Sequence, residues 1–588
     1  MKLNKVWIHN FRSIKDAEFN LLNYSILVGE NNSGKSNILY TLRAFYEEGG
    51  FKFKNDVDFP KFSTDGQDSF VELHFLTSDE EQENLRTEYQ SEDKILRVRR
   101  YFYSDNKELV QNNQSNIYGY EGGELSKNLF YCAKNVGQAK LGNVIFIPAV
   151  SKTDETLKLS GPSPLRDMLN FVMKRAVADS PSYLSLSEAF ETFNKYFREE
   201  ASKDGFSVKE LVTDINKEIE TWKVRFNIDI NAIKPEEIVK GLLTHWIEDE
   251  RLDNSKLNVL SFGQGLQRHL IFTLIRLASK YQPRPLPKKK EFRPDFLLIL
   301  FEEPEAFLHP AQQENLRLSL KTLSDQNETQ VICTTHSAQF VSKNSEELTG
   351  IIKLNRPEYD TKCFQLSEED IRILNEENSE LYKCFCELLA DSNTPDDLKR
   401  EIRRKHLGDE ILDIIKKAFE ESFKYFLYLD SERSSLFFAN HVLICEGASE
   451  KKFIDLINYN NRPSFRAKQI YVLDAMGKFN IHRFMTLLGK LGITHSIIFD
   501  EDENRSYHQV INDFLNDNKN KYTVKAHSFK TDLETFLGID EPERPDLKPL
   551  NVILQYSGGK ISQEKINELE RILEDLCETD SSKPNKLA

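Results

Sequence analysis

Carboxylate residues follow two apolar segments in the C-terminal part of the chain, and their spacing is typical of a metal site. Glu446 follows the segment HVLIC at 441–445, and Glu450 comes about one helical turn later. Asp500 and Asp502 follow a second apolar segment. Carboxylates that converge without a nearby lysine repel one another, and Mg²⁺ or Mn²⁺ relieves that repulsion. Two such ions can cleave a phosphodiester, because one activates water and the other stabilises the leaving oxygen. A strand end that simply meets solvent is the alternative interpretation.

The elements around these four acids predict a small parallel α/β unit. Strands are expected around 441–445, 470–473 and 496–499, and the helix between the last two has an apolar face. The residues of that face are Phe484, Leu487, Leu488 and Leu491. Ligands bind at the carboxyl ends of parallel strands, so the four acids should share one edge of the sheet.

Three further candidate residues lie downstream. Asp532 and Glu534 are expected on a strand-to-helix turn in KTDLETFLG. Lys560 lies in a glycine-flanked loop, where a lysine could stabilise the pentavalent phosphate or protonate the leaving oxygen. A solvated surface lysine is an equally good interpretation of Lys560.

The segment GENNSGKS at 29–36 fits the phosphate-binding pattern G-x-x-x-x-G-K-[ST]. It follows a short apolar strand at 24–28 and precedes a helix with apolar periodicity, which is the context that the pattern requires. Lys35 is expected to reach the β- and γ-phosphates, and the hydroxyl of Ser36 is expected to bind Mg²⁺. The other loop residues expected to bind ATP are Asn31, Asn32, Ser33 and Gly34.

Three later segments complete the pattern of an ATPase. FLLILFEEPEAFLHP predicts a parallel strand buried on both faces, which ends on Glu302 and Glu303. Glu302, where Asp is more common, is expected in the Mg²⁺ shell, and Glu303 is expected to orient the attacking water. Ser261 and Gly263 belong to a small-residue loop, LSFGQG, that opens an apolar helix and can bind phosphate. A last buried strand, QVICTT, ends at His336.

The composition is that of a soluble globular protein with several domains. The chain has 588 residues, of which 29% are charged and 39% hydrophobic, and no apolar run is long enough to cross a bilayer. The net charge of −15 is not typical of a general nucleic-acid binder, although metal-binding acids contribute to it. Seven scattered cysteines and no apparent secretory signal fit a reducing cytoplasm. Cys384 and Cys386, with no partner pair, make a poor zinc site.

The middle of the chain divides into a β-rich segment at 71–150 and a helical segment at 152–222. The apolar helical stripes consist of Phe190, Phe193 and Phe197, and of Leu211, Ile215, Ile219 and Trp222. Such an insertion can serve as packed core or as a dimerisation arm, and we favour the arm. Two basic runs, at 288–290 and 399–406, could contact DNA phosphates, although solvated loops are commoner.

The order of P-loop, Ser-Gly loop, acid-ended strand and His-ended strand resembles the ABC-type ATPases of chromosome maintenance and DNA repair. Their signature loop usually reads LSGGQ, and here Phe262 stands in a glycine position. The N-terminal IHNFRSIKDAEFNL is also similar to the opening strands of those ATPase heads. In that family the signature loop of one subunit closes on the ATP of another, so the resemblance implies a head-to-head dimer.

The C-terminal acids resemble those of the Toprim domain, found in topoisomerases, primases and some nucleases, and E-G-x-x-E at 446–450 is similar to its nuclease branch. An ABC-type head followed by a Toprim domain resembles the overcoming-lysogenization-defect (OLD) family. That family includes the nuclease subunit of the Gabija anti-phage system and effectors of some retrons. The motifs that match best are GENNSGKS, LSFGQG, LILFEEPE, TTHS, SLFFANHVLICEGASEKKF, GKFN, FDEDEN and DLETFLG.

This resemblance implies an ATP-regulated DNA endonuclease of anti-phage defence that uses ATP and Mg²⁺ or Mn²⁺, with two ions in the Toprim site. It also implies a homodimer or larger oligomer formed through the heads. The implied companion is a helicase-like protein, or a reverse transcriptase with its RNA, and no membrane is involved. The implied metal ligands are Glu446, Glu450, Asp500, Asp502, Glu534 and Ser36, and the implied catalytic residues are Glu446, Asp500, Asp502, Lys560 and Glu303.

We therefore expect an α/β protein with an ABC-type P-loop ATPase head at 1–355, interrupted by a helical dimerisation insertion at 152–250. A helical linker at 356–435 and a parallel βαβ Toprim domain at 436–588 should follow. An ATPase that clamps DNA with a non-catalytic Toprim scaffold is the alternative, and the complete set of four acids disfavours it. A topoisomerase would need a separate domain with a DNA-cleaving tyrosine and a primase a zinc module, and the sequence indicates neither.

Overall fold

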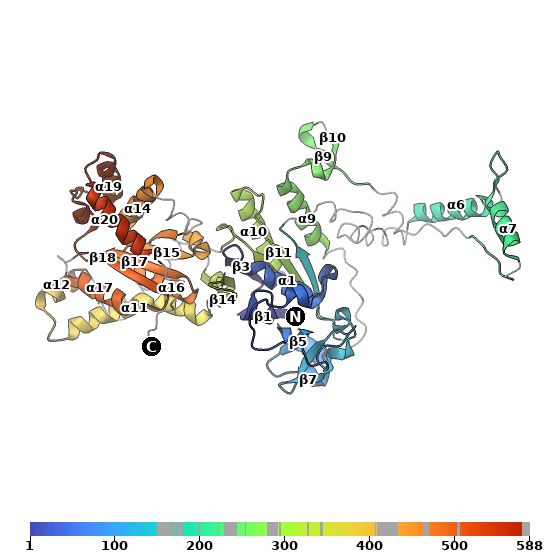
Figure 1. Cartoon of the computed structure of the whole chain (residues 1–588), viewed down its shortest axis with the longest axis horizontal. Coiled ribbons are helices and arrows are strands. Elements are labelled where there is room, and N and C mark those ends of the chain that lie inside the picture. Colours follow the sequence, from blue (N-terminus) through green and yellow to red (C-terminus); the bar gives the residue numbers. More distant parts are fainter. Residues whose placement is uncertain are drawn as a thin grey trace. The chain divides into compact units, whose positions relative to one another are not determined.

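The protein, seen in a computed structural model, divides into two compact units (Figure 1). The first combines Met1–Ala149 with Lys290–Ala588, and the second is Val150–Lys289. The residues that the structure describes are 1–149, 169, 173, 180–197, 200–220, 223–228, 244–252, 255–278, 292, 294, 296–325, 329–341, 345–405, 407, 433–461, 470–502 and 506–578. Within these ranges, no helix has the length and apolar character needed to cross a membrane.

An antiparallel sheet of six strands, in the order β2-β1-β4-β5-β6-β7, begins the first unit. Its strands are β1 (Lys2–Phe11), β2 (Ile14–Asn20), β4 (Ser69–Leu76), β5 (Ile95–Tyr103), β6 (Ile117–Glu121) and β7 (Glu124–Leu129), with the short helices α2 (Asn55–Asp58) and α3 (Asp79–Asn84) between them. Side chains of a strand alternate between its two faces, so Val6 and Ile8 of β1 point to the same side. They join Ile38 and Leu42 of α1 (Lys35–Tyr46) in one buried cluster, which packs this sheet onto the helix that follows the phosphate loop.

A second sheet of six strands, in the order β14-β13-β3-β12-β11-β8, carries the phosphate loop. Its strands are β3 (Tyr24–Gly29), β8 (Asn143–Ile147), β11 (Leu297–Glu302), β12 (Thr329–Thr334), β13 (Ile351–Asn355) and β14 (Lys362–Gln365), and α10 (Pro310–Ser324) connects β11 to β12. All neighbours are parallel except β13 and β14. Gly29, Glu302 and Thr334 therefore end three adjacent strands at one edge. Because β13 and β14 form a hairpin, this sheet continues past the domain boundary expected at residue 355.

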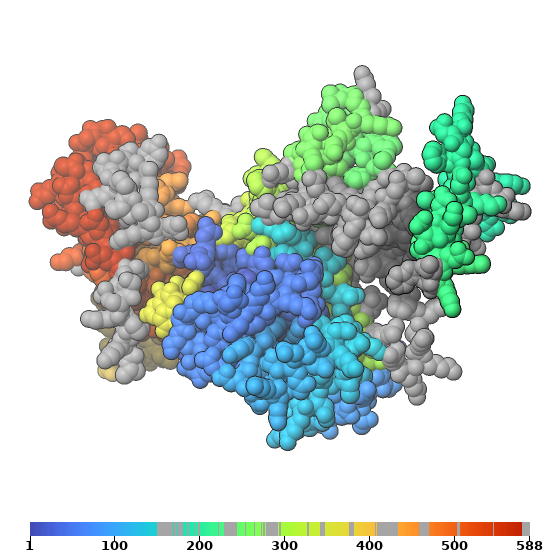
Figure 2. All heavy atoms as spheres, turned by 45° about the vertical axis from the view of Figure 1, so that its right-hand side comes forward, coloured from blue at the N-terminus to red at the C-terminus, as the bar shows by residue number. Residues whose placement is uncertain are grey.

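The second unit contains α6 (Pro181–Phe197), α7 (Val208–Glu218), the hairpin of β9 (Ile247–Asp249) with β10 (Ser255–Leu257), and α9 (Gln264–Ala278). It extends beyond the insertion expected at 152–250, because the Ser-Gly loop and α9 group with it. On α6 the rings of Phe193 and Phe197 stack with centroids 5.0 Å apart. Phe193 is 47% exposed. The green atoms of α7, at the right of the space-filling view, have no other atoms in front of them (Figure 2). Trp222 and the lysines at 288–290 lie outside the described residues.

The linker expected at 356–435 contains β14 of the ATPase sheet, followed by two helices, α11 (Glu368–Ala390) and α12 (Asp396–Arg404). The basic run at 399–406 begins on α12, and its last residue is not described. Lys490 pairs with Asp370 of α11 at 2.7 Å. The side chain of Asn355, at the end of β13, donates to the carbonyl of Gly492 at 2.8 Å. The linker and the ATPase sheet thus both contact the C-terminal domain.

A parallel sheet of four strands, in the order β16-β15-β17-β18, forms the C-terminal domain. Its strands are β15 (His441–Cys445), β16 (Ile470–Asp474), β17 (Thr494–Asp500) and β18 (Thr523–Phe529). Its helices are α14 (Ala448–Asn461), α16 (Lys478–Lys490), α17 (Ser506–Asp517), α18 (Leu533–Leu537), α19 (Lys548–Ser557) and α20 (Gln563–Leu576). The three expected strands are present, and the expected apolar face of α16 is buried. The fourth strand, β18, brings the turn with Asp532 to the same edge as the other acids.

Candidate active site

The loop between β3 and α1 has the shape of a phosphate-binding loop. Gly34 has a φ of 103°, a left-handed conformation that favours glycine. A Cβ on Gly29 would lie 2.4 Å from the carbonyl oxygen of Leu354, so a larger residue does not fit there. The ammonium of Lys35 donates to the carbonyls of Gly29 at 3.0 Å and Glu30 at 2.6 Å. Burial lowers the pKa of Lys35 to about 8, and an anion beside it would favour its charged form.

The remaining polar groups of the loop fit a nucleotide with its cation. Asn31 and Asn32 are exposed at the tip of the loop. Ser33 is buried, and its Oγ has no hydrogen-bond partner within the described residues. The hydroxyl of Ser36 donates to the carboxylate of Glu302, so the two predicted ligands of the ATP-bound Mg²⁺ are already in contact.

The acid-ended strand and the His-ended strand meet beside this loop. Glu303 has a φ of 44°, and its N–H donates to the carbonyl and the hydroxyl of Thr334 at 3.0 and 3.1 Å. Nε2 of His336 lies 3.6 Å from Oε1 of Glu303. Burial and the charge of Lys35 lower the pKa of His336 to about 4, so the imidazole is neutral at neutral pH. The contact between His336 and Glu303 is therefore not an ion pair.

The Ser-Gly loop lies in the second unit. Ser261 ends a 3₁₀ turn that begins at Val259, and Gly263 directly precedes α9. Both residues are exposed. Their expected role at the ATP of another subunit stays a prediction.

All four expected acids of the C-terminal domain lie at one edge of its sheet. Glu446 directly follows β15, and its Oε2 accepts from the N–H of Asp500, the last residue of β17, at 3.1 Å. Glu450 lies in the first turn of α14, and its Oε2 accepts a hydrogen bond from the backbone N–H of Gly447 at 3.0 Å. The N–H of Asp502 donates to the carbonyl of Thr531 at 3.1 Å, which holds Asp502 next to the end of β18. The parallel strand ends therefore gather these carboxylates.

Burial raises the pKa of three of these carboxyls. It raises the pKa of Asp500 to about 9, and the charges of Glu450 and Glu446 add to the effect. It also raises the pKa of Glu450 to about 7 and raises the pKa of Glu446. Oδ1 of Asp500 is buried and has no hydrogen-bond partner in the part of the chain that is described. Carboxyls with raised pKa values, one of which has an oxygen without a hydrogen-bond partner among the described residues, fit a divalent cation that displaces protons as it binds.

A buried lysine lies among these acids, so the expectation that they have no lysine partner was wrong. Lys478, the first residue of α16, is 3% exposed. Its Nζ donates to Oδ2 of Asp502 at 3.1 Å and lies 3.9 Å from Oε2 of Glu446. Nδ1 of His508, on α17, lies 2.9 Å from the same oxygen of Asp502. Burial would raise the pKa of Asp502, but His508 and Lys478 lower it to about 2, so Asp502 is ionised at neutral pH.

A second acidic cluster lies on the turn after β18. Ligand oxygens of Asp532, Glu534 and Glu541 lie within 4.8 Å of one another, a set of three found nowhere else in the described ranges. Glu534 is 1% exposed, and its Oε1 has no hydrogen-bond partner in those ranges. Lys548 lies 3.5 Å from the other oxygen of Glu534 and 3.0 Å from Glu541. The charge of Glu534 contributes to the raised pKa of Asp500, so the two clusters adjoin.

Lys560 does not join either cluster. It lies exposed in the loop between α19 and α20, where its N–H donates to the carbonyl of Gln555 at 3.0 Å. Lys548, which the sequence patterns did not indicate, is the lysine that contacts the second cluster. It begins α19, and no motif marks it. A catalytic role of Lys560 stays a prediction.

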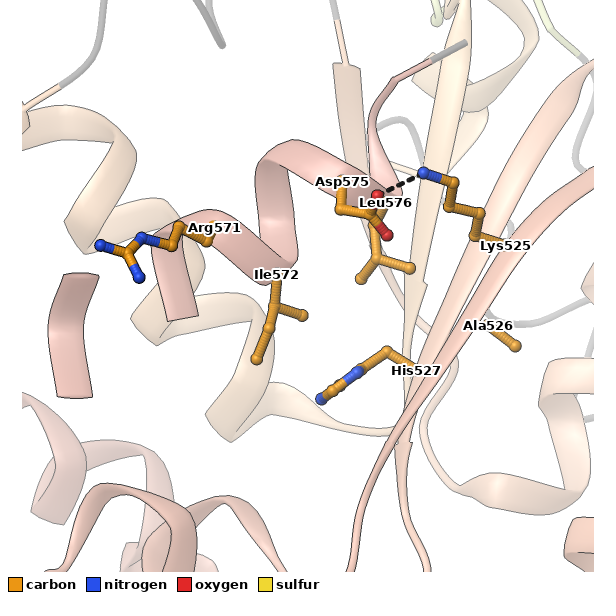
Figure 3. A pocket seen from close by; sticks show the side chains of 7 residues that line it. All are labelled: Lys525, Ala526, His527, Arg571, Ile572, Asp575 and Leu576. Carbon is orange, nitrogen blue, oxygen red and sulfur yellow. Dashed lines mark hydrogen bonds and ion pairs between the residues drawn. The ribbon is translucent and has the colours of Figure 1, made fainter. Parts of the chain in front are cut away.

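A hollow of about 400 Å³ between β18 and α20 offers no comparable chemistry (Figure 3). Its lining includes Lys525, His527, Arg571 and Asp575. Asp575 is the one acid of the lining, and it is already paired with Lys525. The side chain of Arg571 extends away from this pair (Figure 3). The carboxylate edge is therefore the stronger candidate for an active site.

Comparisons with known proteins give the same two domains. A family model described as AAA ATPase domain matches residues 1–341, more than half of the chain. A second model, described as overcoming lysogenization defect protein-like, TOPRIM domain, matches residues 437–502. The chain is similar to the Old nuclease of Escherichia phage P2, with 23% identity over 85% of this chain and 77% of that protein. It is also similar to Endonuclease GajA of Bacillus cereus (strain VD045), with 22% identity over 85% of this chain and 75% of that protein.

Solved structures with detectable similarity include an Smc head bound to the C-winged helix domain of ScpA and Stu0660 of Streptococcus thermophilus. The Smc head is 15% identical, with a TM-score of 0.35 over 63% of this chain and 99% of that chain. Stu0660 is 10% identical, with a TM-score of 0.36 over 72% of this chain and 94% of that chain. The family models and the observed sheets together show an ATPase joined to a Toprim domain. The chain belongs to the AAA ATPase domain family and, within it, is an ATPase–Toprim protein of the OLD type.

Proposed function

We propose that the protein is an ATP-regulated, divalent-metal-dependent DNA endonuclease. The observation that carries this proposal is the carboxylate edge, where buried Glu450 and partly buried Glu446 and Asp500 have raised pKa values and lie beside ionised Asp502. Such a cluster destabilises a fold unless protons or cations neutralise it. The names of the two curated relatives, both nucleases, support a phosphodiester as the bond that is cleaved.

The residues of this edge suit distinct tasks. Glu446, Glu450 and Asp500 would hold a cation, and the N–H of Asp500 fixes the orientation of the Glu446 carboxylate. A divalent cation supplies an activated water and a stabilised leaving oxygen. Glu534 would hold a second ion next to the first. Lys560 is exposed and outside both clusters, which leaves its ammonium accessible to a DNA phosphate.

The head supplies the ATP-dependent part of the proposal. Lys35 and the loop backbone would bind the phosphates, and Ser36 with Glu302 would bind the accompanying Mg²⁺. Glu303, whose N–H donates to Thr334 and whose carboxylate lies next to neutral His336, would orient the attacking water.

Plasmid cleavage by the purified full-length protein tests the proposal. The reactions contain Mg²⁺ or Mn²⁺, with and without ATP, and compare the wild type with Glu446→Ala and Lys35→Ala. Asp517→Asn, an exposed acid on α17, is the matched control. We expect Glu446→Ala to reduce cleavage at least about a hundredfold. Lys35→Ala should abolish the response to ATP and keep the metal requirement.

Equal cleavage by Glu446→Ala and the wild type would contradict the proposed active site. If no form cleaves but the wild type retains DNA in the presence of ATP, the clamp with a non-catalytic Toprim scaffold is correct instead.

The antiviral role is part of the same proposal and needs a cellular test. Phage plating on cells that express the wild type should be reduced relative to cells that express Glu446→Ala. The expected companion, a helicase-like protein or a reverse transcriptase with its RNA, would be identified by co-purification from the native host.

A further inference from the structure

The position of Lys478 is fixed by the backbone before it. Gly477 precedes α16 with a φ of 120°, and its N–H donates to the carbonyl of Glu446 at 2.8 Å. The N–H of Ala475 donates to the carbonyl of Cys445 at 2.9 Å. The turn between β16 and α16 is therefore tied to the end of β15, and the first side chain of α16 enters the acidic edge.

Groups from three elements face the ammonium of Lys478. Oδ2 of Asp502, after β17, and Nδ1 of His508, on α17, are each 3.1 Å from Nζ. Oε2 of Glu446, after β15, is 3.9 Å away, and the ring centroid of Phe499 is 5.9 Å away. A buried charge is stable only when it is paired and hydrogen-bonded, as it is here. Lys478 is therefore a counter-ion that the protein itself supplies to this edge.

The same contacts orient a candidate metal ligand. Lys478 and His508 both contact Oδ2 of Asp502, which leaves Oδ1 as the oxygen available to a cation. Lys478 thus has two effects that oppose each other. It holds Asp502 in one orientation, and its positive charge weakens the attraction between the edge and a cation.

We propose that Lys478 is a positioning residue of the nuclease site. As a counter-ion it orients Asp502 for cleavage, and its positive charge lowers the affinity of the site for a divalent cation. This inference rests on the proposed nuclease function. Lys478 and His508 both contact Oδ2 of Asp502, and Lys478 also faces Oε2 of Glu446 at 3.9 Å.

Lys478→Met tests the two effects separately, because methionine keeps the length of the side chain and removes its charge. Binding of Mn²⁺ to the nucleotide-free, full-length protein, followed by the electron paramagnetic resonance signal of the free ion, should become about tenfold tighter. The rate of plasmid cleavage at saturating Mn²⁺ should nevertheless fall at least about tenfold, because Asp502 loses its fixed orientation.

Three variants serve as references. His508→Gln should slow cleavage about tenfold, because it removes the 2.9 Å contact that orients Oδ2 of Asp502. Lys525→Met removes a lysine that is paired with Asp575 outside the acidic edge, and it should change neither quantity (Figure 3). Glu446→Ala identifies which part of the Mn²⁺ binding belongs to the Toprim site.

The outcomes are distinct. Weaker Mn²⁺ binding in Lys478→Met would overturn the counter-ion role, and unchanged cleavage would overturn the positioning role. A wild type without Glu446-dependent Mn²⁺ binding would overturn the proposed function itself. If Lys478→Met does not fold, Lys478→Gln is judged by the same two measurements.

Discussion

Replacement of Asp500 by asparagine should stabilise the cation-free protein at alkaline pH. Burial raises the pKa of Asp500 from its ordinary 3.8 to about 9. Above about pH 4 the unfolded chain releases this proton and the folded chain retains it. The stability that the protonated group contributes is thus complete below pH 4 and is lost as the pH rises towards 9. Asparagine has nearly the same shape and carries no titratable proton.

The expected gain in the free energy of unfolding is about 1.4 kcal/mol for each pH unit over which Asp500 is protonated in the folded state and ionised in the unfolded state. At pH 8 the difference extends over roughly 4 units, which sets an upper limit of about 6 kcal/mol. At pH 5 it extends over roughly 1 unit. Because the amide forms new contacts and the neighbouring acids titrate together with Asp500, we expect a gain of roughly 1–4 kcal/mol at pH 8 and less than about 1 kcal/mol at pH 5.

Hydrogen exchange of the β15 and β17 amides in increasing urea, with EDTA present, measures the stability of this sheet in the full-length protein. Asp517→Asn is the control at each pH. Mn²⁺ should then stabilise the wild type, more at pH 8 than at pH 5, and should stabilise Asp500→Asn much less.

The reasoning would be refuted by an Asp500→Asn protein that is less stable than the wild type at pH 8. An equal gain at both pH values would show that burial does not hold the proton on Asp500. Equal stabilisation of both proteins by Mn²⁺ would remove Asp500 from the set of metal ligands.

Three other results are expected. Lys560→Ala should slow plasmid cleavage at least about tenfold without changing Mn²⁺ affinity. Lys548→Ala removes the ion pair of Glu534 and should therefore lower the urea midpoint at which the β18 amides lose protection from hydrogen exchange. His336→Gln should slow ATP hydrolysis, measured as phosphate release, and the wild-type rate should show no transition from His336 between pH 6 and 8, since its pKa is about 4. Phe193→Ser combined with Phe197→Ser should lower the mass measured by light scattering, if these exposed rings form the dimerisation arm.

The parts of the structure that could be predicted from the sequence depend on local patterns. A buried strand followed by a glycine-rich loop and a helix identifies the phosphate loop around Lys35. A buried strand that ends on an acid identifies Glu302, Glu446 and Asp500 in the same way. Once strands are expected to be parallel, their carboxyl ends must share an edge, which is where the structure has these acids.

The lysines near the acids could not be predicted from the same local patterns. Lys478 is distant in sequence from Asp502, and Lys548 lies on the second helix after β18. A topological argument would have found Lys478, because β16 pairs in parallel with β15 and the residue that begins the next helix must reach the same edge. No comparable argument exists for Lys548, since its place depends on how α19 folds back. The hairpin of β13 with β14 was missed for the same reason, because pairing between strands decides where a sheet ends.

A short segment just before β15 connects the phosphate loop of the ATPase head with the carboxylate edge of the Toprim domain. Lys353 of β13, beside the strand that leads into the phosphate loop, is fully buried and donates to the carbonyl of Phe437 at 2.8 Å. The side-chain amide of Asn440 lies within hydrogen-bonding distance of the Glu30 carboxylate in the phosphate loop. The chain then continues through β15 to Glu446. A shift of the phosphate loop when ATP binds would therefore act directly on the strand that carries a metal ligand, with no need for the linker helices to rearrange. This contact is the physical basis for expecting ATP to regulate cleavage at the Toprim site.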